Sequence, residues 1–142
     1  MKSRHKAREL AVQTLYSLDF NNKLSLDTDF ELPDLEFQEE EPIEPEARIF
    51  ARYLVQGTLE HLNEVDALIS KYSVNRPIER IDIVDRNILR LAFFQLEYNK
   101  ETHPTIIIDE SVKLSQDLSN DVSFKFINGI LDTYVKKGKS ND

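Results

Sequence analysis

The fold of this chain is decided by residues 82–96, which read DIVDRNILRLAFFQL. Apolar side chains fall here on nearly every side of a helix, at Ile88, Leu89, Leu91, Ala92, Phe93, Phe94 and Leu96. A helix that is apolar all round is normally buried in the interior of a protein. We therefore expect a helix beginning at Asp82 to lie at the centre of the fold, with the other elements packed around it.

Apolar residues continue at helical spacing on both sides of this segment. The pattern predicts four further helical regions, over about 3–19, 46–72 (one helix or a bent pair), 107–118 and about 123–137. Pro77 interrupts the pattern, and residues 99–104 are expected to form a loop. Alternating strand patterns are scarce, since the best of them covers only residues 106–108. The sequence therefore predicts an all-α fold.

Length and composition limit the class of protein. The chain has 142 residues, 40% of them hydrophobic, and contains no cysteine. Such a length is enough for one domain over residues 1–142 with a core that needs no metal or disulfide, and the lack of cysteine excludes zinc–thiolate sites. The N-terminus lacks the apolar core of a signal peptide, and no stretch approaches the roughly 20 apolar residues of a membrane span. We expect a soluble, cytoplasmic protein.

Negative charge is concentrated in one segment. The formal net charge is −8, yet residues 27–46 hold ten acidic residues and no lysine or arginine. With these ten set aside, the rest of the chain carries a net charge of +2. Because local charge decides binding to phosphates, the acidic total argues only weakly against a nucleic-acid ligand. Residues 21–45 are expected to form an acidic connector, by default a solubilising loop, with a partner-binding segment or an RNA mimic as alternatives.

Positive charge gathers at the start of the chain, at Lys2, Arg4, His5, Lys6 and Arg8. The sequence runs from there directly into the first helical pattern, so these side chains are expected on a rigid helix, next to its core-facing stripe. Such a cluster favours binding to a nucleic-acid phosphate backbone. The alternative is a solvated N-terminus that binds nothing.

Four segments of the chain match one known family in order and spacing. They read Arg4-x-x-Ala7-Arg8-x-x-Ala11-Val12-Gln13-x-Leu15-Tyr16, Asp85-Arg86-x-Ile88-Leu89-Arg90-Leu91-Ala92-x-x-x-Leu96, Pro104 followed by Ile108-Asp109-Glu110-Ser111-Val112-x-Leu114, and Phe124-Lys125-Phe126-Ile127-Asn128-Gly129-Ile130-Leu131-Asp132. One segment alone would be an ordinary helical pattern, whereas the four together are specific. The sequence therefore resembles the NusB family of bacterial transcription antitermination factors, and only about residues 21–45 fall outside the match.

The resemblance implies a fold and a function. It implies a compact helical domain made of two small helical bundles packed together. It also implies binding to boxA-type leader RNA of ribosomal-RNA operons together with NusE, the ribosomal small-subunit protein that doubles as a transcription factor. In this role the pair helps RNA polymerase read through terminators. The main rival is a helical protein–protein adaptor with little RNA affinity, and a lesser one is a module associated with ribosomal-RNA methyltransferases.

The resemblance also implies which residues touch RNA. Arg4, Lys6, Arg8 and Phe126 occupy positions that touch RNA in the family, although His5 and Lys6 depart from its arginine-rich run. The full set of candidates is Lys2, Arg4, His5, Lys6, Arg8, Gln13, Tyr16, Lys125 and Phe126. An aromatic ring such as Phe126 stacks on an unpaired base while Lys125 approaches phosphate, unless Phe126 only seals the edge of the core. We expect the cations of the first helix and those of the last helix to form one ridge.

A charged patch ahead of the central helix is implied to meet NusE, and its residues are Glu79, Arg80, Asp85 and Arg86. Acidic side chains that face a basic protein steer its approach and fix its register. The alternative is helix capping, because Asp82 and Asp85 are already favourable near a helix N-terminus. Gly129 lies mid-helix, where its cost is best explained by close approach of another helix.

No catalytic, metal or cofactor site is expected. Asp109 and Glu110 are adjacent on a predicted helix and point about 100° apart, so they cannot share one site. His103 precedes Pro104 in a loop and has no second histidine at ligand spacing. No phosphate-cradling glycine loop or nucleophile motif occurs. The sequence therefore favours a binding protein over an enzyme.

Overall fold

The computed structural model describes residues 2–33 and 43–140, apart from the side chains of Lys2, Lys139 and Ser140. Within these ranges the regular structure is entirely helical, with α1 (Lys2–Phe20), α2 (Pro45–Glu60), α3 (Leu62–Tyr72), the short 3₁₀ helix η1 (Ile78–Arg80), α4 (Ile83–Tyr98), α5 (Pro104–Leu118) and α6 (Ser123–Ser140). The all-α prediction is confirmed, and the region 46–72 is the predicted pair of helices, which meet at His61.

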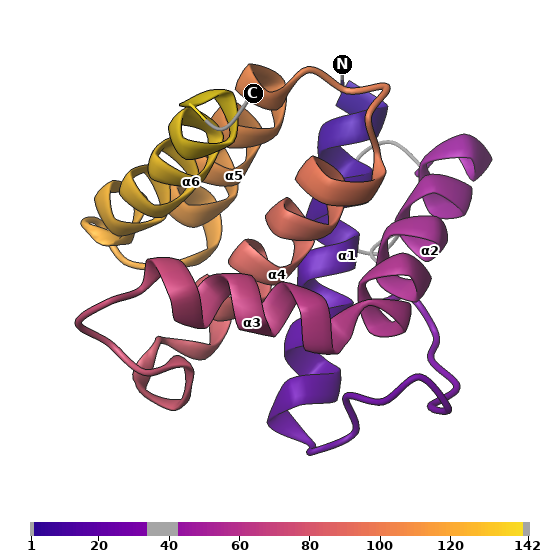
Figure 1. Ribbon diagram of the computed structural model, residues 1–142. Helices are drawn as coiled ribbons and strands as arrows, with labels where there is room; N and C mark the ends of the chain where they lie inside the picture. The colour runs from indigo at the N-terminus through magenta and orange to yellow at the C-terminus, as the bar shows by residue number, and fades with distance from the viewer. Residues whose placement is uncertain (1, 34–42, 141–142) are drawn as a thin grey trace.

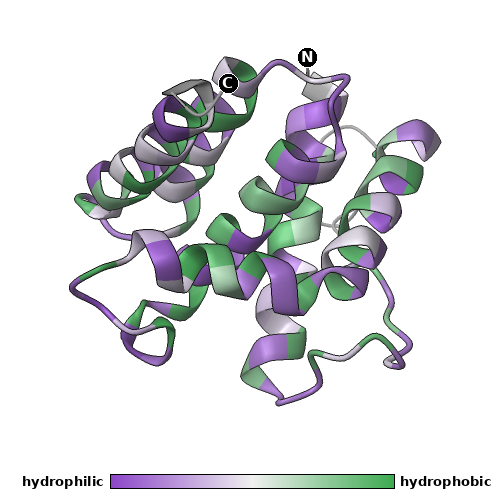
Figure 2. Ribbon diagram, in the orientation of Figure 1, coloured by the Kyte–Doolittle hydropathy of each residue, from purple (hydrophilic) through white to green (hydrophobic). Residues whose placement is uncertain are grey.

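Helix α4 lies at the centre of the molecule, between α1 and α2 on one side and α5 and α6 on the other (Figure 1). Every residue from Asn87 to Leu96 is buried, which confirms the prediction from the apolar run. Figure 2 colours much of this helix as hydrophobic. The two groups of helices are the two small bundles implied by the resemblance, and α3 crosses below them.

The helix ends follow local sequence signals. Asp82 caps α4, because its side chain accepts hydrogen bonds from the backbone N–H groups of Val84 and Asp85 at 2.9 and 3.4 Å. Helix α5 begins at Pro104, the position where a missing N–H costs least. Asn120 plays the capping part before α6, where its side chain accepts from Ser123 N–H at 3.0 Å. Because α5 already begins at Pro104, the loop predicted over residues 99–104 is one residue shorter than expected.

Close helix packing occurs at Gly57 and not at Gly129. A Cβ atom at Gly57 would lie 2.0 Å from Cζ of Phe94, so α2 and α4 can cross there only because the residue has no side chain. A Cβ at Gly129 would meet nothing within 4 Å. The sequence-based explanation of Gly129 is thus wrong, and the close approach belongs to Gly57.

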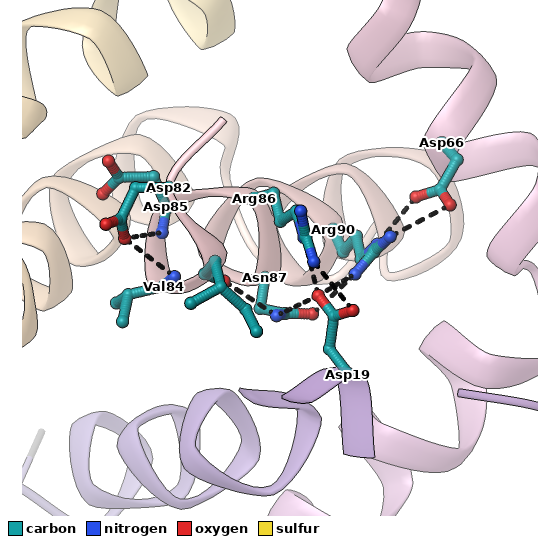
Figure 3. Close-up of polar contacts among 9 residues, drawn as sticks. Asp19, Asp66, Asp82, Val84, Asp85, Arg86, Asn87 and Arg90 are labelled. Carbon is teal, nitrogen blue, oxygen red and sulfur yellow. Dashed lines mark hydrogen bonds and ion pairs between the residues drawn. The ribbon is translucent and has the colours of Figure 1, made fainter. Parts of the chain in front are cut away.

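A network of ion pairs joins three helices around Asp19, the penultimate residue of α1 (Figure 3). Arg86 of α4 donates to both carboxylate oxygens, at 2.7 and 3.0 Å. Asn87 and Arg90 donate to the same carboxylate, each at 2.9 Å. Arg90 also donates to Asp66 of α3 at 2.8 and 3.2 Å. The network ties the end of α1 to the start of α4 and to α3.

The pKa of Asp19 reflects this setting. Burial alone would raise it, but hydrogen bonds from Arg86 and Asn87 and the charge of Arg90 outweigh burial and hold the pKa below its ordinary value. The carboxylate therefore stays ionised and keeps its partners.

Candidate nucleic-acid interface

The two arginines at the start of α1 have different surroundings. Arg4 is exposed, and its guanidinium lies over the ring of Phe50 with Cζ 4.0 Å from the ring centroid. Arg8 is only 4% exposed, and its Nε donates to the side chain of Gln95 on α4 at 2.8 Å. Burial lowers the pKa of Arg8, and the charge of Glu110 opposes this. The prediction that Arg8 contacts RNA thus needs correction, because its side chain anchors α1 from within.

His5 and Lys6, which lie between Arg4 and Arg8, are half-buried. His5 Nδ1 lies 2.5 Å from the carboxylate of Glu110, and its Nε2 lies 3.6 Å from that of Asp117, so His5 links α1 to α5. Lys6 Nζ lies 3.5 Å from the carboxylate of Glu9, one turn along α1. The side chain of Lys2 falls outside the described residues. Around Arg4, the first turns of α1 therefore carry a mixture of cations and paired acids.

Gln13 and Tyr16 lie further along α1 and are both half-buried. The side-chain oxygen of Gln13 is buried and has no hydrogen-bond partner in the part of the chain that the structure describes. The ring of Tyr16 stacks on Phe20, with centroids 6.0 Å apart and planes 15° apart. Phe20 is 66% exposed and was not singled out from the sequence, although its i, i+4 spacing from Tyr16 was an available signal.

Lys125 and Phe126 occupy the first turn of α6. Lys125 is exposed, whereas Phe126 is half-buried and packs against the edge of the core. The guanidinium of Arg76, from the turn after α3, lies over the ring of Phe126 with Cζ 4.5 Å from its centroid. The sequence did not single out Arg76, because it is 50 residues away and only the fold brings it to this ring.

The predicted partner patch is not one surface. Glu79 and Arg80 are exposed in η1, but Asp85 is 2% exposed and Arg86 is bound to Asp19. Burial raises the pKa of Asp85, and hydrogen bonding to the hydroxyls of Ser123 and Ser119 opposes this. The expectation that Asp85 faces a partner is therefore corrected: its carboxyl points into the α5–α6 junction. Arg86 likewise serves the internal network.

The cations form two clusters and not the single ridge expected from the sequence. The first turns of α1, which carry Arg4, lie at the top of Figure 1, whereas the start of α6, which carries Lys125, lies at the left edge, above the level of α3. Helix α5 connects the two regions, because His5 contacts it and it leads directly into α6 through Ser119. A ligand that touches both clusters must therefore extend along this side of the molecule.

A groove of about 1440 Å³ lies between α1, α2 and the loop before α5, and Arg4 is one of its lining residues. Exposed apolar side chains line it, including Ile49 (70% exposed) and Ile106 (50% exposed). The aromatic rings of Tyr53 and Tyr98 also line it. Its charged residues are of both signs, namely Arg4, Arg8, Lys100, Glu46, Glu101 and Glu110. Three carboxylates in the lining repel a phosphate chain, so within this groove only the edge that carries Arg4 belongs to the candidate RNA surface.

The described helices and side chains limit the kind of site. No helix in the described residues is long and apolar enough to cross a membrane. Over residues 2–33 and 43–140, no three or more histidine, aspartate or glutamate side chains are grouped so that they could hold a metal ion.

The helices define a small two-bundle helical domain, with the cation–aromatic contacts of Arg4 and Arg76 on its surface. The model of the NusB family matches residues 5–136, and the chain belongs to that family. A transcription antitermination protein NusB from a Nitratiruptor species is 37% identical, covering 99% of this chain and 96% of that protein.

Solved structures agree with this assignment. T. maritima NusB has a TM-score of 0.77 and 32% identity, covering 94% of this chain and 90% of that one. A chain in the crystal structure of antitermination factors NusB and NusE in complex with dsRNA has a TM-score of 0.76 and 27% identity, over 96% of this chain and 98% of that one. The match therefore extends over both bundles.

Proposed function

We propose that this protein is a transcription antitermination factor that binds boxA-type leader RNA of ribosomal-RNA operons together with NusE and promotes read-through by RNA polymerase. One observation carries the proposal: the chain matches transcription antitermination proteins NusB along almost its whole length. A structural neighbour of the same fold forms a complex with NusE and dsRNA. The two cation–aromatic clusters are physically suited to such a ligand.

The residues divide into phosphate-binding and base-binding groups. Arg4 is exposed and held over Phe50, so its outer N–H groups can donate to a phosphate. Lys6 and Lys125 add positive charge that attracts the backbone without reading sequence. Tyr16 offers a ring face on which an unpaired base stacks, and Phe126 forms the aromatic base of a second stacking position, under the guanidinium of Arg76.

The NusE partner fits the exposed charges of η1. Glu79 is exposed and available to a basic protein, with Arg80 beside it. Asp85 and Arg86 act indirectly, because they fix the start of α4 against the α5–α6 junction and α1. This assignment differs from the sequence-based one in giving surface contacts to only two of the four residues.

The test is RNA binding with and without NusE over a range of salt concentrations. Fluorescence anisotropy with a labelled boxA-type RNA should show affinity that falls as salt rises, because bound phosphates release counterions. NusE should tighten binding. Arg4→Ala should weaken RNA binding. Arg52→Ala should not, although Arg52 is also an exposed arginine, which lies on α2 with its guanidinium over the ring of Phe30.

A protein-only adaptor makes the opposite prediction. It would bind NusE normally but leave the labelled RNA unbound, or bound equally to a scrambled sequence. Either result at low salt, in the presence of NusE, would exclude the proposed function.

A further inference from the structure

Arg76 lies in a turn that directs its side chain towards α6. The turn follows α3, and the hydroxyl of Ser73 donates to the carbonyl of Arg76 at 2.6 Å. Ser73 is itself buried, and Pro77 restricts the backbone on the other side of Arg76. The backbone of Arg76 is thereby held in one place while its side chain remains exposed.

Two features hold the guanidinium of Arg76 above α6. One is the ring of Phe126, whose centroid is 4.5 Å from Cζ. The other is the buried carboxyl of Asp85, on which the positive charge of Arg76 acts. One oxygen of that carboxyl has no hydrogen-bond partner in the described part of the chain, so its negative charge is not fully compensated by contacts of its own. Both interactions favour a guanidinium at this position.

We propose that Arg76 is an RNA-binding residue: its guanidinium, stacked on Phe126, presents its outer face to an unpaired base. The proposal rests on the proposed function and adds a base-binding step to it. A planar guanidinium stacks on bases as aromatic rings do, and its N–H groups also reach phosphate oxygens. Lys125, the residue before Phe126, is exposed and supplies a second cation for the same nucleotide. The order of the stack is base, Arg76, Phe126.

The opposite reading makes Arg76 a cover for Phe126. In that case the guanidinium protects the ring from water and must leave before a base can stack on it. Removing Arg76 would then leave RNA affinity unchanged or increase it. The two readings therefore predict effects of opposite sign.

The experiment compares Arg76→Ala, Arg76→Lys and Phe126→Ala with the unaltered protein, using the boxA-type RNA and NusE. Arg76→Ala should weaken RNA binding about tenfold, the loss typical of one stacking contact. The slope of log affinity against log salt concentration should become shallower by about one. Arg76→Lys should keep the salt dependence but not the affinity, because lysine carries the same charge and lacks the planar group that stacks on a base. Arg52→Ala is the matched control, since Arg52 is also exposed and lies over a phenylalanine ring.

A double variant tests the stack itself. If Arg76 acts through Phe126, then Arg76→Ala combined with Phe126→Ala should weaken binding less than the product of the single losses. Thermal unfolding should show that Arg76→Ala is folded, since its side chain is exposed. RNA affinity of Arg76→Ala within about twofold of the unaltered protein, or tighter, overturns the proposal. Failure of the unaltered protein to bind RNA defeats the proposed function as well, and the two failures are thereby distinguished.

Discussion

At the scale of single residues, Arg8 and Asp85 bring charge into the interior. Arg8 has a defined partner in Gln95 and an opposite charge nearby in Glu110. The burial of Asp85 is offset by the hydroxyls of Ser123 and Ser119 and by the positive charge of Arg76. A buried charge with incomplete hydrogen bonding destabilises the fold and is kept where it serves another purpose. Asp85 interacts with Ser119 and Ser123 at the α5–α6 junction and with the charge of Arg76.

The substitution Asp85→Asn tests whether the cost of burying the Asp85 carboxylate exceeds the gain from its serine hydrogen bonds. Burial raises the folded-state pKa of Asp85 above its unfolded value, so its stabilising contribution is present at low pH and is lost as pH rises through the folded pKa. Asparagine stays neutral throughout. As pH rises above about 4, the ordinary aspartate pKa, the free energy of unfolding of the variant should therefore increase relative to that of the unaltered protein.

Urea unfolding at pH 3 and pH 7 provides the measurement, read as the difference between the two proteins. Asp82→Asn is the contrasting control, because Asp82 is an exposed helix cap whose loss should not stabilise the protein at either pH. A variant less stable at pH 7 than the unaltered protein would show that the serine hydrogen bonds outweigh the cost of burial.

At the scale of helices, apolar spacing predicted the elements well because it is a local property. Every predicted helix is present, and the first spans Lys2–Phe20 against an expected 3–19. What the spacing could not predict is which flank of a helix becomes covered. Arg4 and Arg8 are one turn apart, yet only Arg8 is buried, because Gln95 of α4 reaches it. The contact between Phe126 and Arg76 could not be predicted for the same reason, because it depends on how α3 and α6 pack.

The two glycines within helices offer a matched pair of substitutions. Gly57→Ala should destabilise the protein by about 1–3 kcal/mol or more, because the new methyl group would overlap the buried ring of Phe94. Gly129→Ala should stabilise it by about 0.5–1 kcal/mol, because space is open there and alanine restricts the unfolded chain. Chemical denaturation of both variants checks the prediction, and effects of equal sign would contradict the helix crossing described for α2 and α4.

At the scale of the whole molecule, the Asp19 network joins α1 and α3 to the central helix α4. Asp19 belongs to α1, while Arg86 and Arg90 belong to the central helix, and Asp66 extends the contact to α3. Arg86 was expected on a partner surface, because sequence spacing alone cannot show that α1 ends beside it. One carboxylate that accepts hydrogen bonds from three side chains of α4 therefore fixes the end of α1 against the central helix.

Asp19→Asn should accordingly lower the unfolding free energy by about 3 kcal/mol at pH 7, as expected when one member of a buried ion network is removed. The folded-state pKa of Asp19 is lowered, so its contribution is present above the ordinary aspartate pKa and is lost as pH falls through the lower folded value. The difference between variant and unaltered protein should thus shrink in acid. Asp27→Asn, at an exposed site, is the control, and an equal loss there would show that the effect is not due to the network.

The position of Arg4 over Phe50 has a thermodynamic consequence for any ligand of α1. A long arginine side chain that swings freely loses rotamer entropy when it is immobilised, whereas one already resting on an aromatic ring has less to lose. Arg76 over Phe126 is in the same situation at the other end of the molecule. Calorimetry of complex formation should then record a heat-capacity change due to base stacking alone, since neither arginine contact requires a segment of chain to be ordered.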